Sequence, residues 1–335
     1  MAAPYAELHV HSCFSLLDAP CQPAALAQRA AELGYEHLGL TDHQGLHGAV
    51  RFVQACRQVG IHPVIGAEVT LEDGSHLTLL AEDDQGYATL ARLLSAAQLG
   101  WEAPRRPVAR AGPEATAGTT AMRRAVRIPW DWLLEEHAGL VVLTGCRRGP
   151  LARALDAGDR AGALALARRL RQVFGPERCA VEIQDHGLPG DQRRCAELAA
   201  LAEVAGLPLV ATNNVHYLDA ESWRLQDVLV CIREQCTLDT PHPARKRSSA
   251  YALRPPAAMA RRFARYPQAV VNTLRLAERL AARRPREEGQ TTAEYALVIL
   301  AAAAIAVVLI AWARSSGKLP AFFDAVIDQV IGSAQ

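Results

Sequence analysis

Apolar residues occur in two patterns that alternate along the chain. Short, mostly apolar runs, which are typical of buried strands, lie at 7–11, 37–41, 62–68, 76–81, 140–146, 180–186 and 209–216. Stretches with apolar residues three and four positions apart, which are typical of amphipathic helices, lie at 23–33, 48–59, 86–98, 151–174 and 192–205. This rhythm predicts an α/β fold of about seven parallel strands covered by helices, as a barrel or an open sheet. We expect residues 220–282 to be helical.

Composition restricts the class of protein. Lys+Arg number 36 and Asp+Glu 35, so the net charge of +1 gives no overall electrostatic footprint for nucleic acid, and any such contact has to come from local patches. Hydrophobic residues make up 50% of the chain, enough for a sizeable core. The 8 cysteines are scattered without a Cys-x-x-Cys pair and no secretory signal opens the sequence, so we expect reduced thiols in a cytosolic domain.

Residues 100–127 interrupt the alternation of predicted strands and helices. They are rich in Ala, Pro, Gly, Thr and Arg and show little periodicity, so we expect a surface loop that is partly disordered. The arginines of this loop are suited to contact phosphate, although a solvated loop of arbitrary charge explains the composition better.

Side chains of metal-binding types follow several of the predicted strands. His9 and His11 are two positions apart, so on an extended strand they face the same side. Asp42 and His43 end the next apolar run, and Glu68 ends the one after it. A single His-x-His pair arises by coincidence about as often as by function. Recurrence after three successive strands favours one shared site, because catalytic groups of β/α barrels collect at the carboxyl ends of strands.

The candidate ligands share a position at or near the ends of these strands. They are His9, His11, Asp18, His43, Glu68, His76, Cys146, Asn214 and His216. Imidazoles with carboxylates suit Zn²⁺, Mn²⁺ or Fe²⁺ more than Ca²⁺, and a cysteine ligand favours zinc. A mixed set of this size indicates more than one metal ion. Paired metals stabilise the attacking and leaving oxygens of a phosphate ester, so the set predicts phosphoesterase chemistry.

Seven segments carry a family resemblance: ELHVHSCFSLLDA, HLGLTDHQGLHGAVRF, PVIGAEV, HLTLLAEDDQGY, GLVVLTGCRRGPLA, VATNNVHYLDAESWRLQDVLVCIR and SSAYALRPPAAMARRF. Through them, residues 5–284 resemble the PHP (polymerase and histidinol phosphatase) domain, especially that of bacterial C-family DNA polymerase α subunits of the error-prone branch. The resemblance implies a distorted (β/α)7 barrel over residues 1–219, a helical extension over 220–284, and up to three divalent metal ions, most simply Zn²⁺ or Mn²⁺. Its metal ligands match the set above, except that the fullest sites of the family carry Asp where this chain has Asn214.

The resemblance also implies roles and partners. Asp42 and His43 are the implied catalytic residues, with Asp42 orienting a neighbouring histidine. Active members of the family are linked to 3′–5′ exonuclease proofreading at a DNA 3′ end, whereas others support polymerase partners as an inert scaffold. The neutral amide of Asn214 favours loss of one metal ion, which keeps the inert alternative open, and a small-molecule phosphatase is a third alternative. Nothing here resembles the polymerase palm, so we expect no DNA extension by this chain.

The last fifty residues differ from the rest. Residues 296–313 are 18 positions without a charge, the length needed to cross a bilayer, so we expect one inner-membrane helix. Arginines are more numerous before this stretch than after it, which places the PHP region in the cytoplasm.

The segment 285–335 also resembles Flp-type pilins. Gly289 and Gln290 match the cleavage site of that family, and Glu294 and Tyr295 match its Glu-Tyr pair. The resemblance implies cleavage between Gly289 and Gln290 by a pilin-processing peptidase. Because a polymerase domain before a pilin is an unusual pair, we expect a fusion of two unrelated reading frames, by rearrangement or by a gene-calling error.

Overall fold

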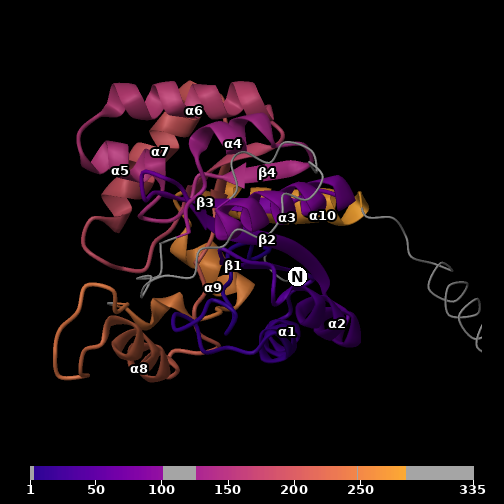
Figure 1. Ribbon diagram of the computed structural model, residues 1–335, viewed down its shortest axis with the longest axis vertical. Helices are drawn as coiled ribbons and strands as arrows, with labels where there is room; N and C mark the ends of the chain where they lie inside the picture. Colours follow the sequence, from indigo (N-terminus) through magenta and orange to yellow (C-terminus); the bar gives the residue numbers. More distant parts are fainter. Residues whose placement is uncertain (1–3, 101–125, 247, 284–335) are drawn as a thin grey trace, which may run out of the picture. The chain divides into compact units, whose positions relative to one another are not determined.

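The computed structural model describes residues 4–100, 126–246 and 248–283. The chain divides into two compact units, Met1–Arg284 and Pro285–Gln335, and every described residue belongs to the first. Strands and helices alternate through this unit (Figure 1). The expected α/β class is therefore correct.

Six strands form one curled sheet in the order β1-β2-β3-β4-β5-β6. They are β1 (His37–His43), β2 (His62–Thr70), β3 (His76–Ala81), β4 (Leu140–Leu143), β5 (Cys179–Ile183) and β6 (Leu209–Ala211). The expectation that all strands are parallel is wrong at β3, which is antiparallel to both β2 and β4. Residues 71–75 connect β2 to β3, and so short a connection permits a hairpin but not the crossover that parallel strands need.

The segment that carries the His-x-His pair connects the edge strand β1 to the residues that follow β6, the other edge strand. On one side, the backbone N–H of Gly39 donates to Glu7 O at 2.7 Å. On the other side, Val215 exchanges two bonds of 2.8 Å with the backbone of His9 and His11. The expected (β/α)7 barrel is thus, in the part that the structure describes, a six-stranded curled sheet closed by one extended segment that makes only isolated bridges.

Eleven helical segments occur in the described ranges: α1 (Pro23–Glu32), α2 (Ala49–Val59), α3 (Asp84–Leu99), α4 (Trp130–Glu135), α5 (Pro150–Asp156), α6 (Arg160–Phe174), α7 (Asp191–Ala205), α8 (Trp223–Glu234), the short 3₁₀ segment Ser249–Tyr251, α9 (Pro256–Arg262) and α10 (Pro267–Ala282). The single helix expected at 151–174 is wrong. Gly158 takes a φ of +80° between α5 and α6, and Asp159 caps the second helix by accepting a bond of 2.8 Å from the Gly162 N–H. A left-handed glycine ends a helix and an aspartate begins one, which explains the break.

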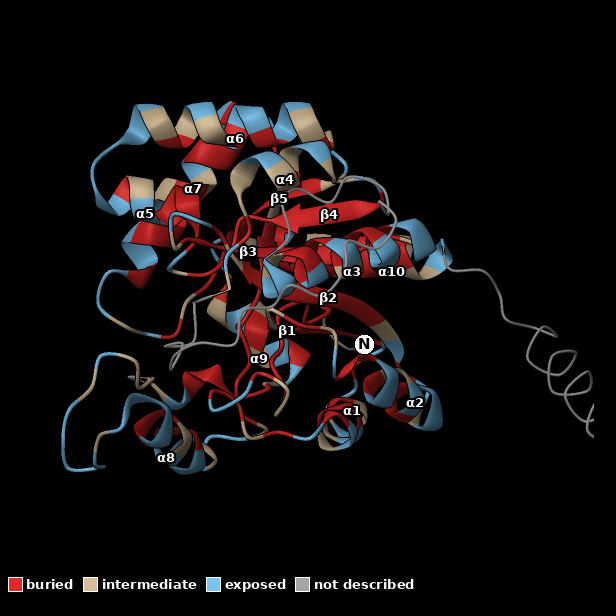
Figure 2. Cartoon of the chain, in the orientation of Figure 1, coloured by how far each residue is buried: buried red, intermediate tan, exposed pale blue. Residues whose placement is uncertain are grey.

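One face of the sheet is apolar toward one end and polar toward the other. The polar end holds the carboxyl ends of β1 and β2 and the amino end of the antiparallel β3. Leu8, Val64 and Leu80 form a small apolar cluster with Leu276 and Leu280 of α10. α10 packs against β1, β2 and β6. A larger cluster fills the space between the strands and most other helices, which bury one side and expose the other (Figure 2). Because α10 covers the apolar end, the polar end is the part of this face that stays available for a site.

No helix among the described residues is long and apolar enough to cross a membrane. The stretch 296–313, the Gly289/Gln290 junction and the rest of the segment 285–335 lie outside the described residues, as does most of the loop 100–127.

A close backbone contact between α3 and the start of β4 allows a test of the fold. A Cβ on Gly86 would lie 1.9 Å from Gly139 O. We therefore expect Gly86→Ala to lower the free energy of unfolding by about 2 kcal/mol or more, although alanine favours helix. Gly60→Ala is the control, because Gly60 has a φ of +75° but no atom within 4 Å, so it loses only about 1 kcal/mol of backbone preference. Equal losses in urea unfolding would contradict this account.

Candidate metal centre

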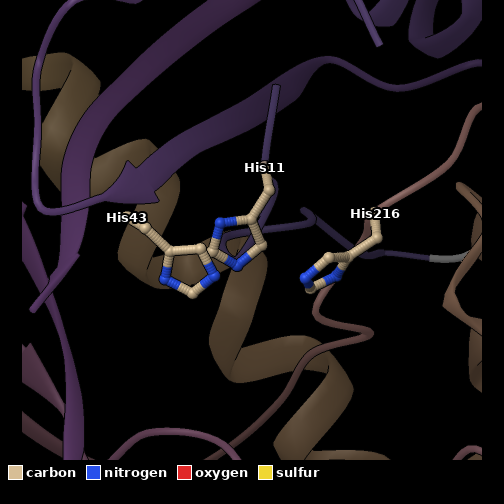
Figure 3. Close-up of side chains that lie close together, drawn as sticks. All are labelled: His11, His43 and His216. Carbon is tan, nitrogen blue, oxygen red and sulfur yellow. The ribbon is translucent and has the colours of Figure 1, made fainter. Parts of the chain in front are cut away.

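Histidines and carboxylates converge at the polar end of the sheet in three overlapping groups. The groups are His9, His11 and Glu68; His11, His43 and His216; and His43, Glu68 and His76, and within each the ligand atoms all lie within 4.8 Å of one another. Figure 3 shows the rings of His11, His43 and His216 turned toward one another from three segments far apart in the sequence. Their ring centroids are 4.3 Å apart for His11 and His43 and 4.4 Å for His11 and His216.

Glu68 is the shared carboxylate of this cluster. It is 1% exposed, and four imidazoles approach it: His43 at 2.7 Å, His76 at 3.3 Å, His9 at 3.5 Å and His11 at 3.9 Å. Burial by itself raises the pKa of Glu68, but His43 and His76 outweigh it and hold the pKa well below its usual range. Glu68 is therefore an anion that bridges two of the three groups.

Asp18 supplies a second carboxylate on the opposite side of the cluster. Its Oδ2 lies 2.9 Å from Nε2 of His216 and 3.1 Å from Nε2 of His43, and its Oδ1 accepts a bond of 2.8 Å from Arg233. Burial raises the pKa of Asp18, but Lys246 and His216 more than offset it and hold the pKa well below its usual range. Asp18 is therefore an anion, and the Arg233 guanidinium already neutralises part of its charge.

Two histidines use Nδ1 for contacts outside the cluster. Nδ1 of His9 lies 2.7 Å from a Glu182 carboxylate oxygen, which can only accept, so this ring nitrogen donates. Nδ1 of His216 donates in the same way to the backbone oxygen of Asn214 at 2.8 Å. In a neutral imidazole the other nitrogen, Nε2, then keeps its lone pair and points into the cluster.

His11 is oriented in the same way through a serine. The Ser15 hydroxyl donates to Asp42 at 2.7 Å, and its oxygen lies 3.2 Å from Nδ1 of His11, so that nitrogen is the donor and Nε2 is again bare. Asp42 also accepts from the N–H and hydroxyl of Ser12, at 2.6 and 2.7 Å. The structure thus places Asp42 behind the histidines, where its described hydrogen bonds reach His11 only through Ser15.

The donor set fits divalent metal ions. Carboxylate–histidine pairs that leave Nε2 bare are the usual arrangement around metal-bound imidazole. Moreover, Nε2 of His9 and Oε1 of Glu68 are buried 3.5 Å apart, and neither has a hydrogen-bond partner within the described ranges. Buried polar atoms without partners are costly, and a metal ion coordinated by both would remove that cost.

The remaining sequence-predicted ligands lie at the edge of the groups. Sγ of Cys146 is 3.8 Å from Nδ1 of His76, and burial, with Glu68 beside it, raises the pKa of this thiol well above its ordinary value. Oδ1 of Asn214 is 3.0 Å from Nε2 of His11, and Asn214 has a φ of +47°, which asparagine tolerates better than most residues. Neither residue completes one of the three groups in the described part of the chain.

Sequence reasoning missed several residues that support this cluster. Glu182 lies inside an apolar strand, and a charge at such a position is a signal for a buried polar contact. Ser15 sits in the turn after the His-x-His pair and gives no comparable signal. Arg233 and Lys246 come from α8 and the loop after it, so only the folded chain brings them to Asp18.

The cluster opens into a cleft of about 830 Å³, here called the metal cleft. His43, Glu68, His76, Cys146 and His216 lie at its floor or wall. Its cationic lining residues are Arg127, Arg147, Arg148, Arg233, Arg245 and Lys246. A cluster of metal-binding side chains in a cleft lined by arginines and a lysine suits a ligand that carries phosphate.

A curled α/β sheet with histidines and carboxylates gathered at its strand ends is the architecture of a metal-binding domain. The PHP domain family matches residues 7–186, and this chain belongs to that family. A second family, a protein of unknown function (DUF4244), matches residues 278–329.

Several curated relatives are DNA polymerases or their subunits. The error-prone DNA polymerase of Symbiobacterium thermophilum is 42% identical over 275 residues, which is 82% of this chain and 25% of that one. The error-prone DNA polymerase of Mycobacterium tuberculosis H37Rv is 36% identical over 288 residues, covering 83% and 24%. The DNA polymerase III subunit alpha of Treponema pallidum is 33% identical over 297 residues, covering 84% and 24%. The chain therefore spans about a quarter of the length of these relatives.

Among solved structures, an amidohydrolase from Chromobacterium violaceum aligns with a TM-score of 0.40 and 16% identity, over 67% of this chain and 96% of that one.

Glu182 offers a test of how the centre is held. Glu182→Gln removes the charge behind His9, and we expect it to weaken zinc binding by about 10–100-fold, measured by competition with a chromogenic chelator. Glu203→Gln on the exposed side of α7 is the matched control and should leave the affinity unchanged. Equal affinity of the two variants would show that Glu182 does not orient a metal ligand.

The metal-free centre also predicts a pH dependence. Burial lowers the pKa of His9 and His43, but Glu182 and Glu68 raise the pKa of His9 to about 10, and Glu68 and Asp18 raise the pKa of His43 to about 9. Both rings hold a proton at pH 7 that a metal ion must displace, so affinity should rise about tenfold or more per pH unit between pH 7 and 9. Calorimetry in two buffers of different ionisation enthalpy measures the released protons. A flat profile would contradict this.

Proposed function

We propose that residues 4–283 form a metal-dependent phosphoesterase domain that hydrolyses phosphodiesters at a DNA 3′ end. The observation that carries the proposal is the set of Nε2 atoms on His9, His11 and His216, each able to bind a metal ion when its ring is neutral, which face the buried carboxylates of Glu68 and Asp18 beneath a cationic cleft. The printed names of the curated relatives, which are DNA polymerases, support DNA as the substrate class.

Different residues of the chain have separate roles in the proposed hydrolysis: metal binding, phosphate binding and proton transfer. The three ligand groups hold up to three ions, and bound divalent ions supply Lewis acidity and lower the pKa of water. Arg147 and Arg148 line the metal cleft, where they bind the phosphate that is to be cleaved. His43, which is partly exposed and contacts both Glu68 and Asp18, is the catalytic candidate for moving a proton. Asp42 supports it from behind through Ser15, which accepts from the backbone N–H of His43 and contacts the ring of His11.

The donor types favour Zn²⁺ or Mn²⁺. Imidazole nitrogens outnumber carboxylates in the three groups, which suits these ions better than Mg²⁺ or Ca²⁺. Cys146 at the edge of the cluster adds to the preference for zinc if its thiolate joins the ligands.

A second candidate function is an inert domain that supports polymerase partners. Asn214 favours it, because its neutral amide lies 3.0 Å from His11 Nε2, where a carboxylate would help to balance a cation. A small-molecule phosphatase is the third candidate, and the relatives give it less support than DNA chemistry.

For the segment 285–335 we propose an inner-membrane helix at 296–313, with the PHP region in the cytoplasm and cleavage after Gly289 by a pilin-processing peptidase. The apolar length and the Glu-Tyr motif support this proposal. The family that matches 278–329 has no assigned function.

The test uses the purified full chain, loaded with Zn²⁺ or Mn²⁺, on single-stranded DNA labelled at its 5′ end. We expect shortening from the 3′ end that falls by at least about a hundredfold in His11→Ala, since removing a ligand costs more than removing an outer partner. His47→Ala, an exposed histidine outside the centre, should keep full activity. Asn214→Asp should increase the activity and the number of bound ions. Inactivity of both the native chain and Asn214→Asp would refute hydrolysis and support the inert domain.

A further inference from the structure

A second cleft lies next to the metal cleft and contains none of the metal-centre residues. Its volume is about 890 Å³, and it is lined by the loop 187–190 after β5, the start of α7, α9, and Arg254 two positions before α9. Four arginines line it, Arg193, Arg254, Arg261 and Arg262, against one carboxylate, Asp185. We call it the arginine cleft. Such an excess of cations over anions at one concave surface calls for an anionic ligand.

Two of these arginines are already used within the protein. Arg193 pairs with Glu197 at 3.0 Å and with Asp156 at 3.2 Å. Arg262 donates to the backbone oxygen of Asp185 at 2.8 Å and so fixes the loop that forms the cleft wall. Both act as structural parts of the cleft.

The other two arginines have no carboxylate partner in the described ranges. The Arg261 guanidinium makes no hydrogen bond or ion pair to the described residues, and Arg254 donates only to the backbone oxygen of Ala250 at 3.3 Å. Burial and the neighbouring Arg262 lower the pKa of Arg254, which means that its cation is held at a cost. An anion between Arg254 and Arg261 would offset that cost.

The lining also indicates what kind of anion binds. Among the described residues, no aromatic side chain lines the arginine cleft, which therefore offers charge and guanidinium donors in place of an aromatic stacking platform. Leu188 lines both clefts, and Tyr251 of the metal cleft precedes Arg254 by three residues. Lys246 lies 4.9 Å above the Tyr251 ring. The cations therefore continue from one cleft to the next, as a polyanion that extends through both would require.

We propose that the arginine cleft binds the sugar–phosphate backbone of a single-stranded DNA whose end lies in the metal cleft. This inference rests on the proposed function, since it assigns the path of the same substrate. Arg254 and Arg261 contact successive phosphates without regard to sequence, and Leu188 lies at the point where the strand passes between the clefts.

The test measures binding in EDTA, by fluorescence anisotropy of labelled oligothymidylates of 3 and 12 nucleotides, with the purified full chain. We expect the 12-mer to bind tighter than the 3-mer, and Arg261→Glu to weaken only the 12-mer, by about tenfold. The slope of log affinity against log salt should fall by about 0.7 for each phosphate that the variant no longer binds. Arg168→Glu, an exposed residue of α6, is the matched control and should bind as the native chain does.

Two results of the binding experiment overturn the proposal. Affinity that does not depend on length indicates a site for a small anion, and equal losses in Arg261→Glu and Arg168→Glu indicate net charge alone. Because Arg261 is exposed and unpaired in the described structure, a folded variant is expected, and a double variant with Arg254→Gln should weaken the 12-mer further. Length-dependent binding with no hydrolysis in any metal by either the native chain or Asn214→Asp would refute the proposed function but keep the arginine cleft. Hydrolysis by the native chain together with unchanged 12-mer binding in Arg261→Glu would keep the proposed function and refute DNA binding in the arginine cleft.

Discussion

The structure depends on one buried carboxylate that four imidazoles share. Glu68 is 1% exposed and lies within 4 Å of His9, His11, His43 and His76. Removing a carboxylate from water costs several kcal/mol, and that cost is offset only if its partners are close and well oriented. The chain therefore has to bring the segment before β1 and the ends of β1, β2 and β3 to the same place, and the curl of the sheet is the geometry that does this.

The register of the strands by itself brings two of the histidines close to Glu68. In the parallel pair β1–β2, His43 lies opposite Glu68. In the hairpin β2–β3, His76 lies opposite Thr70, two residues beyond Glu68 and so on the same face of β2. A one-residue slip of either pair would turn these side chains to the other face, so the apolar side of the strands, which fixes the register, also fixes the ligands. The same strand pairing therefore determines both the packing of the core and the positions of the metal-binding side chains.

The sequence predicted the parts of the centre that follow from strand periodicity. His9, His11, His43 and Glu68 were recognisable because each ends or interrupts an apolar run. The antiparallel β3 was not, because alternation of strands and helices does not report direction, and only the length of the 71–75 connection does. The Ser15 link between Asp42 and His11 depends on the fold of a turn. No pattern along the chain encodes such a link.

The negative charge around the three ligand groups is unequal, and this inequality affects which group binds a metal ion most tightly. Glu68 faces His9, and the Glu182 carboxylate stands directly behind that ring. On the side of His216, the only described carboxylate in contact is Asp18, whose second oxygen already accepts from Arg233 at 2.8 Å, and Asn214 adds no charge. Coulomb attraction inside a protein is strong, so a cation is favoured on the Glu68 side. On the His216 side, a metal ion would compete with the Arg233 guanidinium for the Asp18 carboxylate. The neutral Asn214 amide therefore weakens metal binding on the side where the available negative charge is already smallest.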